Sequence, residues 1–240
     1  HDRNRAVAAA AAVLNAGFDG LGLDLLYGIP GQGLDGWRQT LQEAIDLHPD
    51  HLSCYQLTIE EDTPLALRRR RGEIEMPGDA LQADFFWFTS QFLEENGFVH
   101  YEVSNFARPG RESRHNRKYW IHAPYLGLGP AAHSFSGRER RWNRRSVEAY
   151  LSDLEAGRDP VEANETLDDD QLGLEALFLG LRTRRGICLA SFKARYGRDL
   201  LAERREMIDR LVSEGLVDIR AGFLRPTRAG MAVADSLALI

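Results

Sequence analysis

Residues 114–120, RHNRKYW, combine side chains that could bind a metal or stack on a flat ligand. The segment holds one histidine, His115, close to the aromatic residues Tyr119 and Trp120. A neutral imidazole can ligate iron, and aromatic rings offer apolar surface to a planar molecule. Residue types alone leave three interpretations open: a buried structural histidine, a stacking surface for nucleic acid, and a ligand in an aromatic pocket.

A second group of polar residues lies in, or directly after, four predicted strands. We expect these residues to meet on one side of the barrel, where the strands end. Asp24 is the only charge inside an apolar run, and a buried carboxylate is costly unless it is paired or hydrogen-bonded. It is therefore either satisfied by neighbouring groups or directed at a ligand. The whole group comprises Asp24, Thr58, Glu60, Glu102 and His133.

Arginine-rich segments at 68–71 and 138–145 hold much of the basic charge. One interpretation is a solvated surface loop. The other is a site for acidic groups such as propionates or phosphates, because the planar guanidinium group matches their geometry.

Composition narrows the class of protein. The 240 residues carry a formal net charge of −6, which argues against a general nucleic-acid binder. No apolar run approaches the roughly 20 residues that span a bilayer. Cys54 and Cys188 lie far apart and no export signal is visible, so we expect a cytoplasmic protein. The chain opens on His1 and not on methionine, which favours a fragment of a longer protein.

Residues 1–137 alternate helices and strands with short connections, which predicts parallel βαβ units. We therefore expect an α/β fold, in which these are the C-terminal strands of a partial or full β/α barrel, with function at the strand ends. Residues 138–160 form a basic loop and a linker helix in this interpretation. The predicted helices of the first part are Ala6–Ala16, Leu34–Leu47 and Leu81–Glu95, and the predicted strands are Leu21–Ile29, His51–Ile59 and His100–Phe106. A fourth, short strand is expected within Tyr125–Phe135.

Residues 161–240 are predicted to form a small α+β domain of winged-helix type. A two-stranded hairpin with its turn at Ala221-Gly222 follows three helices. This part holds 12 Lys and Arg against 13 Asp and Glu, so DNA binding is not favoured. The predicted helices are Asp168–Arg182, Ala190–Tyr196, Leu200–Glu214 and Arg228–Leu239.

Five segments occur in an order that resembles one known family: DLLYGIPGQ, HPDHLSCYQLTIEEDTPL, GFVHYEVSNFARPG, SRHNRKYW and YLGLGPAAHS. Together they resemble the HemW family of radical S-adenosylmethionine heme chaperones, which is related to the oxygen-independent coproporphyrinogen III oxidases. The resemblance covers essentially the whole chain. It implies a radical-SAM barrel followed by a C-terminal domain of the HemN type.

The resemblance also implies ligands and partners. Asp24, Thr58 and His133 would contact S-adenosylmethionine. The HNxxYW motif would bind heme, with His115 as a candidate iron ligand; its members are His115, Asn116, Tyr119 and Trp120. The partners would be heme and apo-hemoproteins, which are respiratory proteins in the family. The resemblance leaves open whether the protein contacts a membrane peripherally and whether it forms a homodimer.

The alternative function is radical decarboxylation of coproporphyrinogen, against which the complete HNxxYW motif argues. The family holds a [4Fe-4S] cluster with a CxxxCxxC-type motif that is not found among these residues. By itself, this chain is therefore expected neither to bind the cluster nor to cleave S-adenosylmethionine.

Overall fold

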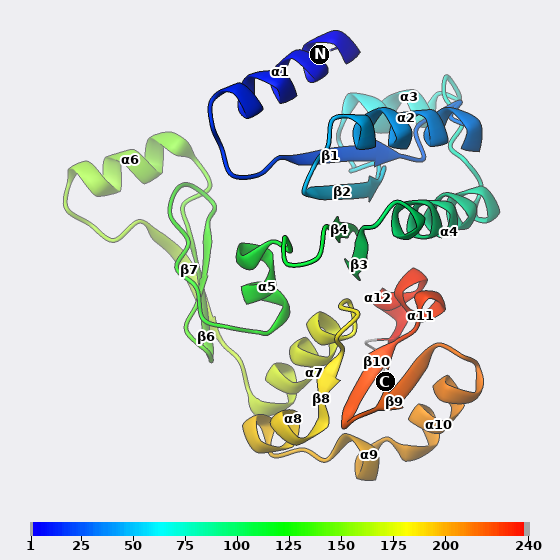
Figure 1. Ribbon diagram of the computed structural model, residues 1–240. Helices are drawn as coiled ribbons and strands as arrows, with labels where there is room; N and C mark the ends of the chain where they lie inside the picture. The colour runs from blue at the N-terminus through cyan, green and yellow to red at the C-terminus, as the bar shows by residue number, and fades with distance from the viewer. Residues whose placement is uncertain (1, 238–240) are drawn as a thin grey trace. The chain divides into compact units, whose positions relative to one another are not determined.

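The structure is a computed structural model that describes residues 2–237 (Figure 1). The chain divides between Ser113 and Arg114 into two compact units, called here the N-terminal unit and the C-terminal unit. Residues 114–120 thus belong to the C-terminal unit, although the sequence pattern grouped them with the barrel. His1, on which the expectation of a fragment rests, lies outside the described residues.

The N-terminal unit contains four helices that precede or connect four strands. Thr63 begins one of them by accepting a hydrogen bond from Ala66 N at 3.2 Å, with Pro64 at the first helical position, where it loses no hydrogen bond. The elements are α1 (Arg3–Asn15), β1 (Gly22–Tyr27), α2 (Leu34–Asp46), β2 (His51–Gln56), α3 (Pro64–Arg70), α4 (Asp79–Glu95), β3 (Val99–Glu102) and β4 (Asn105–Ala107).

These strands form one mixed sheet in the order β1-β2-β4-β3. The predicted βαβ unit is confirmed for β1, α2 and β2, since β1 and β2 are parallel. The predicted third strand, His100–Phe106, is wrong: it is an antiparallel hairpin of β3 and β4. Two residues can join antiparallel strands only, because a parallel connection needs a dozen or more. The described strands therefore do not form the expected parallel barrel segment.

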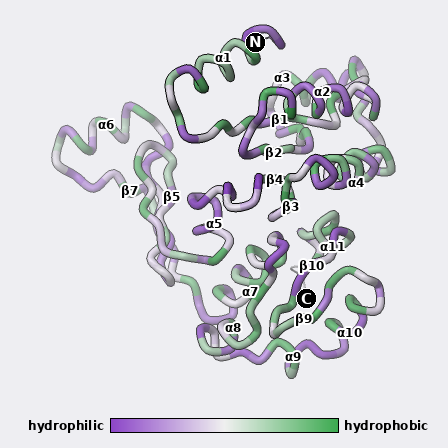
Figure 2. Tube along the Cα trace, in the orientation of Figure 1, coloured by the Kyte–Doolittle hydropathy of each residue, from purple (hydrophilic) through white to green (hydrophobic). Residues whose placement is uncertain are grey.

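One face of this sheet packs on α2 and α4. Trp37 of α2 and Phe85 of α4 are fully buried against Leu52 of β2. The Trp37 indole Nε1 donates a hydrogen bond to Thr89 Oγ1 at 2.7 Å. The buried indole N–H therefore has a hydrogen-bond partner within the core. Apolar and polar residues alternate along both helices, as expected of helices with one face on a core (Figure 2).

The C-terminal unit contains two three-stranded sheets, in the orders β5-β6-β7 and β8-β10-β9. The elements are α5 (Arg114–Trp120), β5 (His133–Phe135), β6 (Glu139–Asn143), α6 (Val147–Glu155), β7 (Val161–Thr166), α7 (Asp169–Gly180), β8 (Ile187–Cys188), α8 (Leu189–Tyr196), α9 (Leu200–Glu203), α10 (Arg205–Ser213), β9 (Val217–Arg220), β10 (Phe223–Pro226), α11 (Arg228–Ala232) and α12 (Ala234–Leu237).

For the middle of the chain, one expectation is confirmed and one is corrected. The short strand expected within Tyr125–Phe135 is seen as His133–Phe135, and it belongs to the C-terminal unit. The segment 138–145 is not a loop, because Glu139–Asn143 forms the central strand β6, paired with β5 and β7. Its arginines remain compatible with a strand because carboxylates on neighbouring elements pair with them.

The predicted C-terminal hairpin is confirmed as β9 and β10. Ala221 and Gly222 both have positive φ angles, 51° and 77°, as a two-residue type I′ turn requires. The predicted helix Leu200–Glu214 is interrupted at Arg204, whose φ of −126° is not helical. The predicted helix Arg228–Leu239 is seen as α11 and α12, and its Leu239 lies outside the described residues.

The core of the second sheet gathers apolar residues from α7, α8, α10 and β10. Leu181, Ile208 and Leu224 are fully buried there. This core supports α5, because α5 packs against α7. Among residues 2–237, no helix is both long and apolar enough to cross a membrane.

Candidate functional site

The HNxxYW residues lie together on α5. Their spacing of i, i+1, i+4 and i+5 places all four side chains on one broad face of the helix. His115 is exposed, and the other three are half-buried. The interpretation of His115 as a buried structural residue is therefore wrong.

Tyr119 contacts the His115 ring in two ways. The two rings meet edge to face with centroids 5.1 Å apart, and Tyr119 Oη lies 3.0 Å from His115 Nε2. If Nε2 donates this hydrogen bond, the lone pair of the neutral ring is on Nδ1. A ligand histidine whose second nitrogen is held in this way is the usual arrangement at a metal. The pair can therefore present Nδ1 of His115 to an iron.

Two pockets of the C-terminal unit flank the end of α5. The first, called here the Tyr119 pocket, has a volume of about 280 Å³ and is lined by Tyr119, Tyr125, Phe178 and Arg140, among others. The second, the Trp120 pocket, has a volume of about 230 Å³ and includes Trp120 in its wall. Both volumes fall below the range for small-molecule sites, about 300–1,000 Å³.

His122 lines both pockets, and sequence reasoning missed it. The residue is 5% exposed, and its ring stacks on Phe135 at 4.5 Å. Nδ1 lies 3.0 Å from Tyr196 Oη, and Nε2 lies 3.3 Å from Glu175 Oε2. Burial lowers the pKa of His122, although the Glu175 carboxylate opposes the shift. A lone histidine in IHAP gives no sequence signal, since its polar partners, Glu175 and Tyr196, lie more than fifty residues further along the chain.

The arginines of the 138–145 segment pair with carboxylates. Arg140 of β6 contacts Glu165 Oε1 at 2.9 Å and Glu175 Oε2 at 2.6 Å. Arg138 pairs with Asp169. A guanidinium that already holds two carboxylates is not available to an incoming propionate or phosphate, so the interpretation as an acidic-ligand site loses support at Arg140.

Asp153 of α6 predicts a particular dependence of stability on pH. Arg158 and Arg144 lower the pKa of the Asp153 carboxyl by hydrogen bonding and charge. The unfolded chain therefore binds this proton first, near pH 4. The stabilisation is present above that pH and is lost as pH falls through the folded-state pKa. We expect the gap in urea midpoint between the wild type and Asp153→Asn to shrink from pH 6 to pH 2.5; a constant gap would contradict this.

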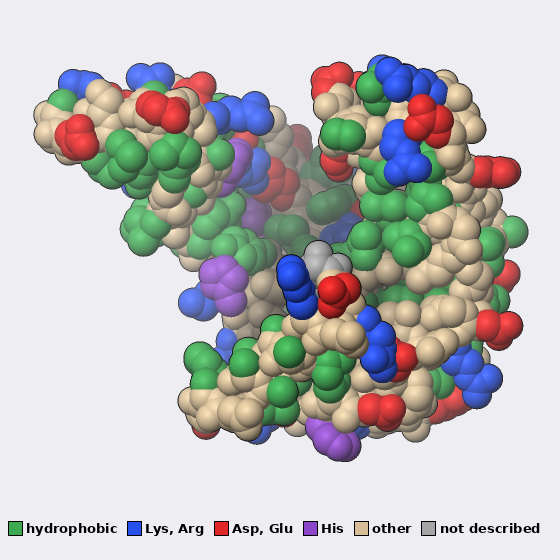
Figure 3. Space-filling model, turned by 90° about the horizontal axis from the view of Figure 1, so that it is seen from above, with side chains coloured by type: hydrophobic (Ala, Val, Ile, Leu, Met, Phe, Trp, Pro, Cys, Tyr) green, Lys and Arg blue, Asp and Glu red, His purple; other side chains and the backbone are tan. Residues whose placement is uncertain are grey.

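An apolar stripe on α6 faces solvent. Val147, Leu151 and Leu154 recur at helical spacing and are 53%, 49% and 47% exposed. In Figure 3, hydrophobic side chains gather over this helix at the left of the view. An exposed stripe of this kind is typical of a surface that packs against another segment or chain.

Polar side chains form a row across the sheet of the N-terminal unit. The strand register aligns Asp24 of β1 with Ser53 of β2, Ser53 with Asn105 of β4, and Asn105 with Glu102 of β3. The row lies on the face opposite the helices, because the alternating residue Leu25 packs into the core. Sequence reasoning found Asp24 and Glu102 but missed the two between them.

Asp24 itself is exposed, so the expectation of a buried carboxylate is wrong. The reason is that β1 is an edge strand with only one face on the helices, and Asp24 points to the other. By contrast, Glu102 is 1% exposed and accepts hydrogen bonds from Ser104 N at 2.9 Å and from the Asn105 amide. Asn105 Oδ1 is buried without a hydrogen-bond partner among the described residues.

The other predicted strand-end residues lie apart from this row. Thr58 and Glu60 are exposed in the loop after β2. His133 is exposed on β5 of the C-terminal unit, where it stacks on Trp142 at 5.6 Å. Of the predicted set, Asp24 and Glu102 lie in this row, but on the two opposite edge strands of the sheet, with β2 and β4 between them.

The glycine-rich loops turn sharply, as the sequence predicted. In GIPGQ, Gly28 has a φ of 72°, and Gln32 Oε1 accepts a hydrogen bond from Gly28 N at 2.8 Å. In GLGPAAHS, a Cβ on Gly127 would lie 2.0 Å from the His133 carbonyl oxygen. The close approach at Gly127 is thus to the chain's own backbone.

The cysteines do not fit an iron–sulfur cluster. Cys54 is buried in the N-terminal unit, and Cys188 is half-buried in the C-terminal unit. Within residues 2–237, no three His, Cys, Asp or Glu side chains are grouped so that they could hold a metal ion.

Comparison with known proteins shows what the chain is similar to. Residues 167–233 match the HemN C-terminal domain. The solved structure of the Escherichia coli coproporphyrinogen III oxidase HemN, a radical SAM enzyme, superposes with a TM-score of 0.78 over 100% of this chain and 58% of its own, at 20% identity. The fold is therefore that of a HemN-type protein.

The sequence relatives narrow this class. The chain is 37% identical over 99% of its length to the heme chaperone HemW of Mycobacterium tuberculosis, and 32% identical over 84% to that of Bacillus subtilis. It spans 59% and 53% of these relatives. A mitochondrial radical S-adenosyl methionine domain-containing protein of Danio rerio is 35% identical over 69% of the chain. The chain is therefore similar to heme chaperones named HemW over most of its own length, while it covers less than two thirds of theirs.

Proposed function

We propose that this chain is the heme-binding part of a heme chaperone that passes heme to apo-proteins. The observation that carries the proposal is the complete HNxxYW set on one face of α5, with His115 exposed and held by Tyr119. The similarity to relatives named heme chaperone HemW supports it.

The geometry suits a transferable ligand. His115 would ligate the iron through Nδ1, while Tyr119 fixes the ring through Nε2. Trp120 and Asn116 are only half-buried, so a heme on this face would keep part of its surface open. An acceptor protein could then take hold of the heme before His115 releases it.

A site for S-adenosylmethionine belongs to the same proposal. Asp24 is its best candidate, because it is exposed on the uncovered sheet face beside Ser53. Thr58 and His133 stay predictions from the family resemblance. Together with an iron–sulfur cluster, the bound cofactor would supply radical chemistry centred on its adenosyl group. The described cysteines do not fit such a cluster.

Heme titration of the 240-residue chain tests the proposal. We expect saturable absorbance near the Soret band in the wild type and at least tenfold weaker binding in His115→Ala, equivalent to about 1.4 kcal/mol or more. Tyr119→Phe should weaken binding by about tenfold, the lower end for lost outer-shell support.

The matched control is His133→Ala, which removes another exposed histidine of the same unit. It should bind heme like the wild type at the α5 site. Equal affinity in the wild type and His115→Ala would contradict the assignment of His115. Decarboxylated product formed from coproporphyrinogen by the complete protein would favour the alternative function.

A further inference from the structure

We propose that the Trp120 pocket and the arginines beside it form a docking surface for an acidic peptide segment of a partner protein, with one apolar side chain of the peptide in the pocket. The inference goes beyond the proposed function, because it concerns a protein partner and needs no bound heme. The docking surface consists of the pocket, which has Phe223 in its wall, and of Arg185, Arg220 and Arg225 beside that ring.

The Trp120 pocket has the size for a single side chain. Its volume of about 230 Å³ is too small for most small-molecule ligands. Trp120, Phe192 and Phe223 line it, and they come from α5, α8 and β10 of one compact unit. Large apolar side chains that fill such pockets supply much of the binding energy at protein interfaces. The pocket therefore fits a leucine or phenylalanine side chain of a peptide.

Three arginines beside the pocket lack acidic partners. The guanidinium carbons of Arg185 and Arg225 lie 5.6 Å and 5.1 Å from the centre of the Phe223 ring. Arg220 of β9 is opposite Phe223 in the strand register. Within the described part of the chain no carboxylate forms an ion pair with these arginines, not even Asp218, which is opposite Arg225. Like charges that gather without a counter-charge favour a negatively charged partner.

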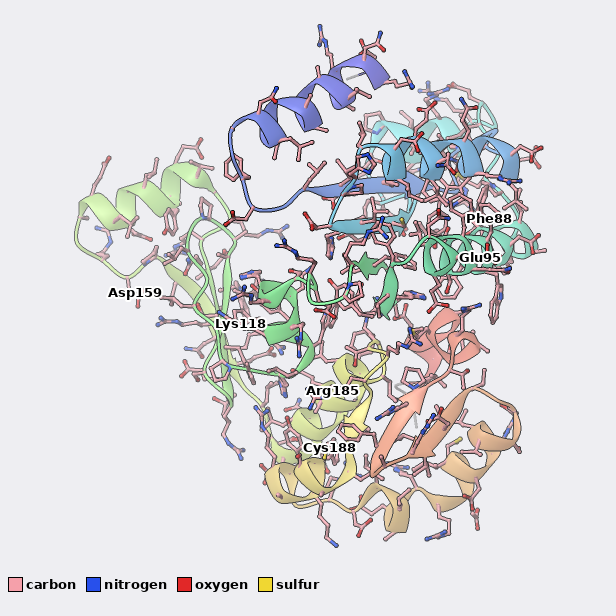
Figure 4. All side chains as sticks on the ribbon, viewed as in Figure 1. Phe88, Glu95, Lys118, Asp159, Arg185 and Cys188 are labelled. Atoms are coloured by element: carbon pink, nitrogen blue, oxygen red, sulfur yellow. The ribbon has the colours of Figure 1, made fainter. Side chains whose placement is uncertain are left out.

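Arg185 is the arginine that lines the pocket and stays available. Figure 4 labels it on the segment between α7 and β8. Arg195 also lines the pocket, but it donates hydrogen bonds to the carbonyl oxygens of Ile121 and His122. Arg185 can therefore receive a carboxylate without losing an ion pair, whereas Arg195 would have to release α5.

Two buried hydrogen-bond donors at this surface also lack acceptors. They are the indole Nε1 of Trp120 and the guanidinium Nε of Arg225, neither of which has a partner within residues 2–237. Such groups are rare in folded proteins, and an unpaired buried donor costs free energy. A peptide offers both backbone carbonyl oxygens and side-chain carboxylates as acceptors. The unpaired donors and the uncompensated charge thus favour the same kind of partner.

A nucleic acid would also bring negative charge, but it fits this unit less well. Helix-turn-helix proteins place a helix in the major groove, between two rows of phosphates. The helix before the hairpin, α10, exposes the carboxylates of Glu206 and Asp209, and its Arg210 pairs with Glu214 at 2.8 Å. The phosphates would repel these carboxylates. The apolar pocket favours a peptide for a second reason, since it accepts an uncharged side chain.

Fluorescence anisotropy with the 240-residue chain tests the arginines. The probe is a fluorescein-labelled peptide that carries one phenylalanine between two pairs of glutamates. We expect saturable binding that Arg185→Gln weakens about two- to fivefold, as expected of one exposed ion pair, and that the double variant with Arg225→Gln weakens about tenfold. Arg210→Gln is the matched control. It removes the same charge from α10, where Glu214 already holds the guanidinium, and should leave the affinity unchanged.

The pocket is tested by a separate variant. Ser191 is exposed and lines the pocket, so Ser191→Phe fills it without removing a core residue. This variant should weaken binding by about fivefold or more, and so should a peptide with serine in place of phenylalanine. His115→Ala should bind the peptide like the wild type. Failure of the heme assignment and failure of this inference are therefore distinguishable.

Several outcomes would overturn the inference. Absence of saturable peptide binding is one, and binding that Arg185→Gln and Ser191→Phe leave unchanged is another. An equal affinity for a peptide with lysines in place of the glutamates would show that charge does not select the partner. Binding of a DNA duplex that Arg185→Gln weakens, without binding of the peptide, would also overturn the inference and would assign the arginines to nucleic acid.

Discussion

Trp37→Ala is expected to destabilise the N-terminal unit by about 3–5 kcal/mol, the range for removing a large aromatic residue from a core. Trp37 is fully buried, and its ring lies 5.5 Å from that of Tyr27. The substitution leaves a cavity between α2 and the sheet. It also removes the hydrogen bond from the indole to Thr89 Oγ1. Thr89 still donates to Phe85 O at 2.6 Å, so the cavity accounts for most of the loss.

Urea unfolding followed by circular dichroism measures this loss. The matched control is Trp87→Ala on α4, because Trp87 is 40% exposed and contributes little to the hydrophobic core. It should cost about 1 kcal/mol or less, as expected of a surface substitution. Similar losses for the two variants would show that the core of the N-terminal unit is not organised around Trp37.

Gly127→Ala is expected to cost about 3 kcal/mol in the C-terminal unit, the upper end for inserting a methyl group into a packed site. The added Cβ would lie 2.0 Å from His133 O and 2.7 Å from its carbonyl carbon. Both are backbone atoms, so no side chain can rotate away. Relief requires the loop to separate from β5, which breaks the bond from Gly127 N to Ser134 Oγ at 3.0 Å.

Gly36→Ala on α2 is the control for the chemical change itself. Gly36 is exposed, and a Cβ there meets nothing within 4 Å. In a helix, replacing glycine by alanine should stabilise by about 0.5–1 kcal/mol. The two variants thus have opposite predicted signs, and a wild-type unfolding midpoint for Gly127→Ala would refute the steric argument.

Short sequence patterns predicted the helices, strands and turns that depend mainly on their own residues. Helices α2 and α4 were visible because Trp37, Leu41 and their neighbours recur at helical spacing. The hairpin at Ala221-Gly222 was visible because few residue pairs accept positive φ angles.

Other features depend on residues that are distant in sequence. Strand β6 depends on carboxylates at 165 and 175 that pair with Arg140. No window of the sequence contains both partners of such a pair.

The candidate site divides in the same way. The HNxxYW motif is contiguous, so its residues and their shared helical face followed from spacing. Asp24 was found, but its exposure was not, because an apolar strand with one uncovered face resembles a fully buried one. His122 and the Trp120 pocket were missed because their partners come from α7, α8 and β10.

Gly127 affects how related sequences should be interpreted. Its lack of a side chain is required by the contact with His133 O, whether or not any cofactor is bound nearby. A descendant that had lost cofactor binding would still be under selection to keep this glycine. The GLGPAAHS motif therefore indicates that a sequence has inherited this loop conformation. Genome surveys that count the motif as a sign of cofactor dependence would overestimate how many members still bind the cofactor.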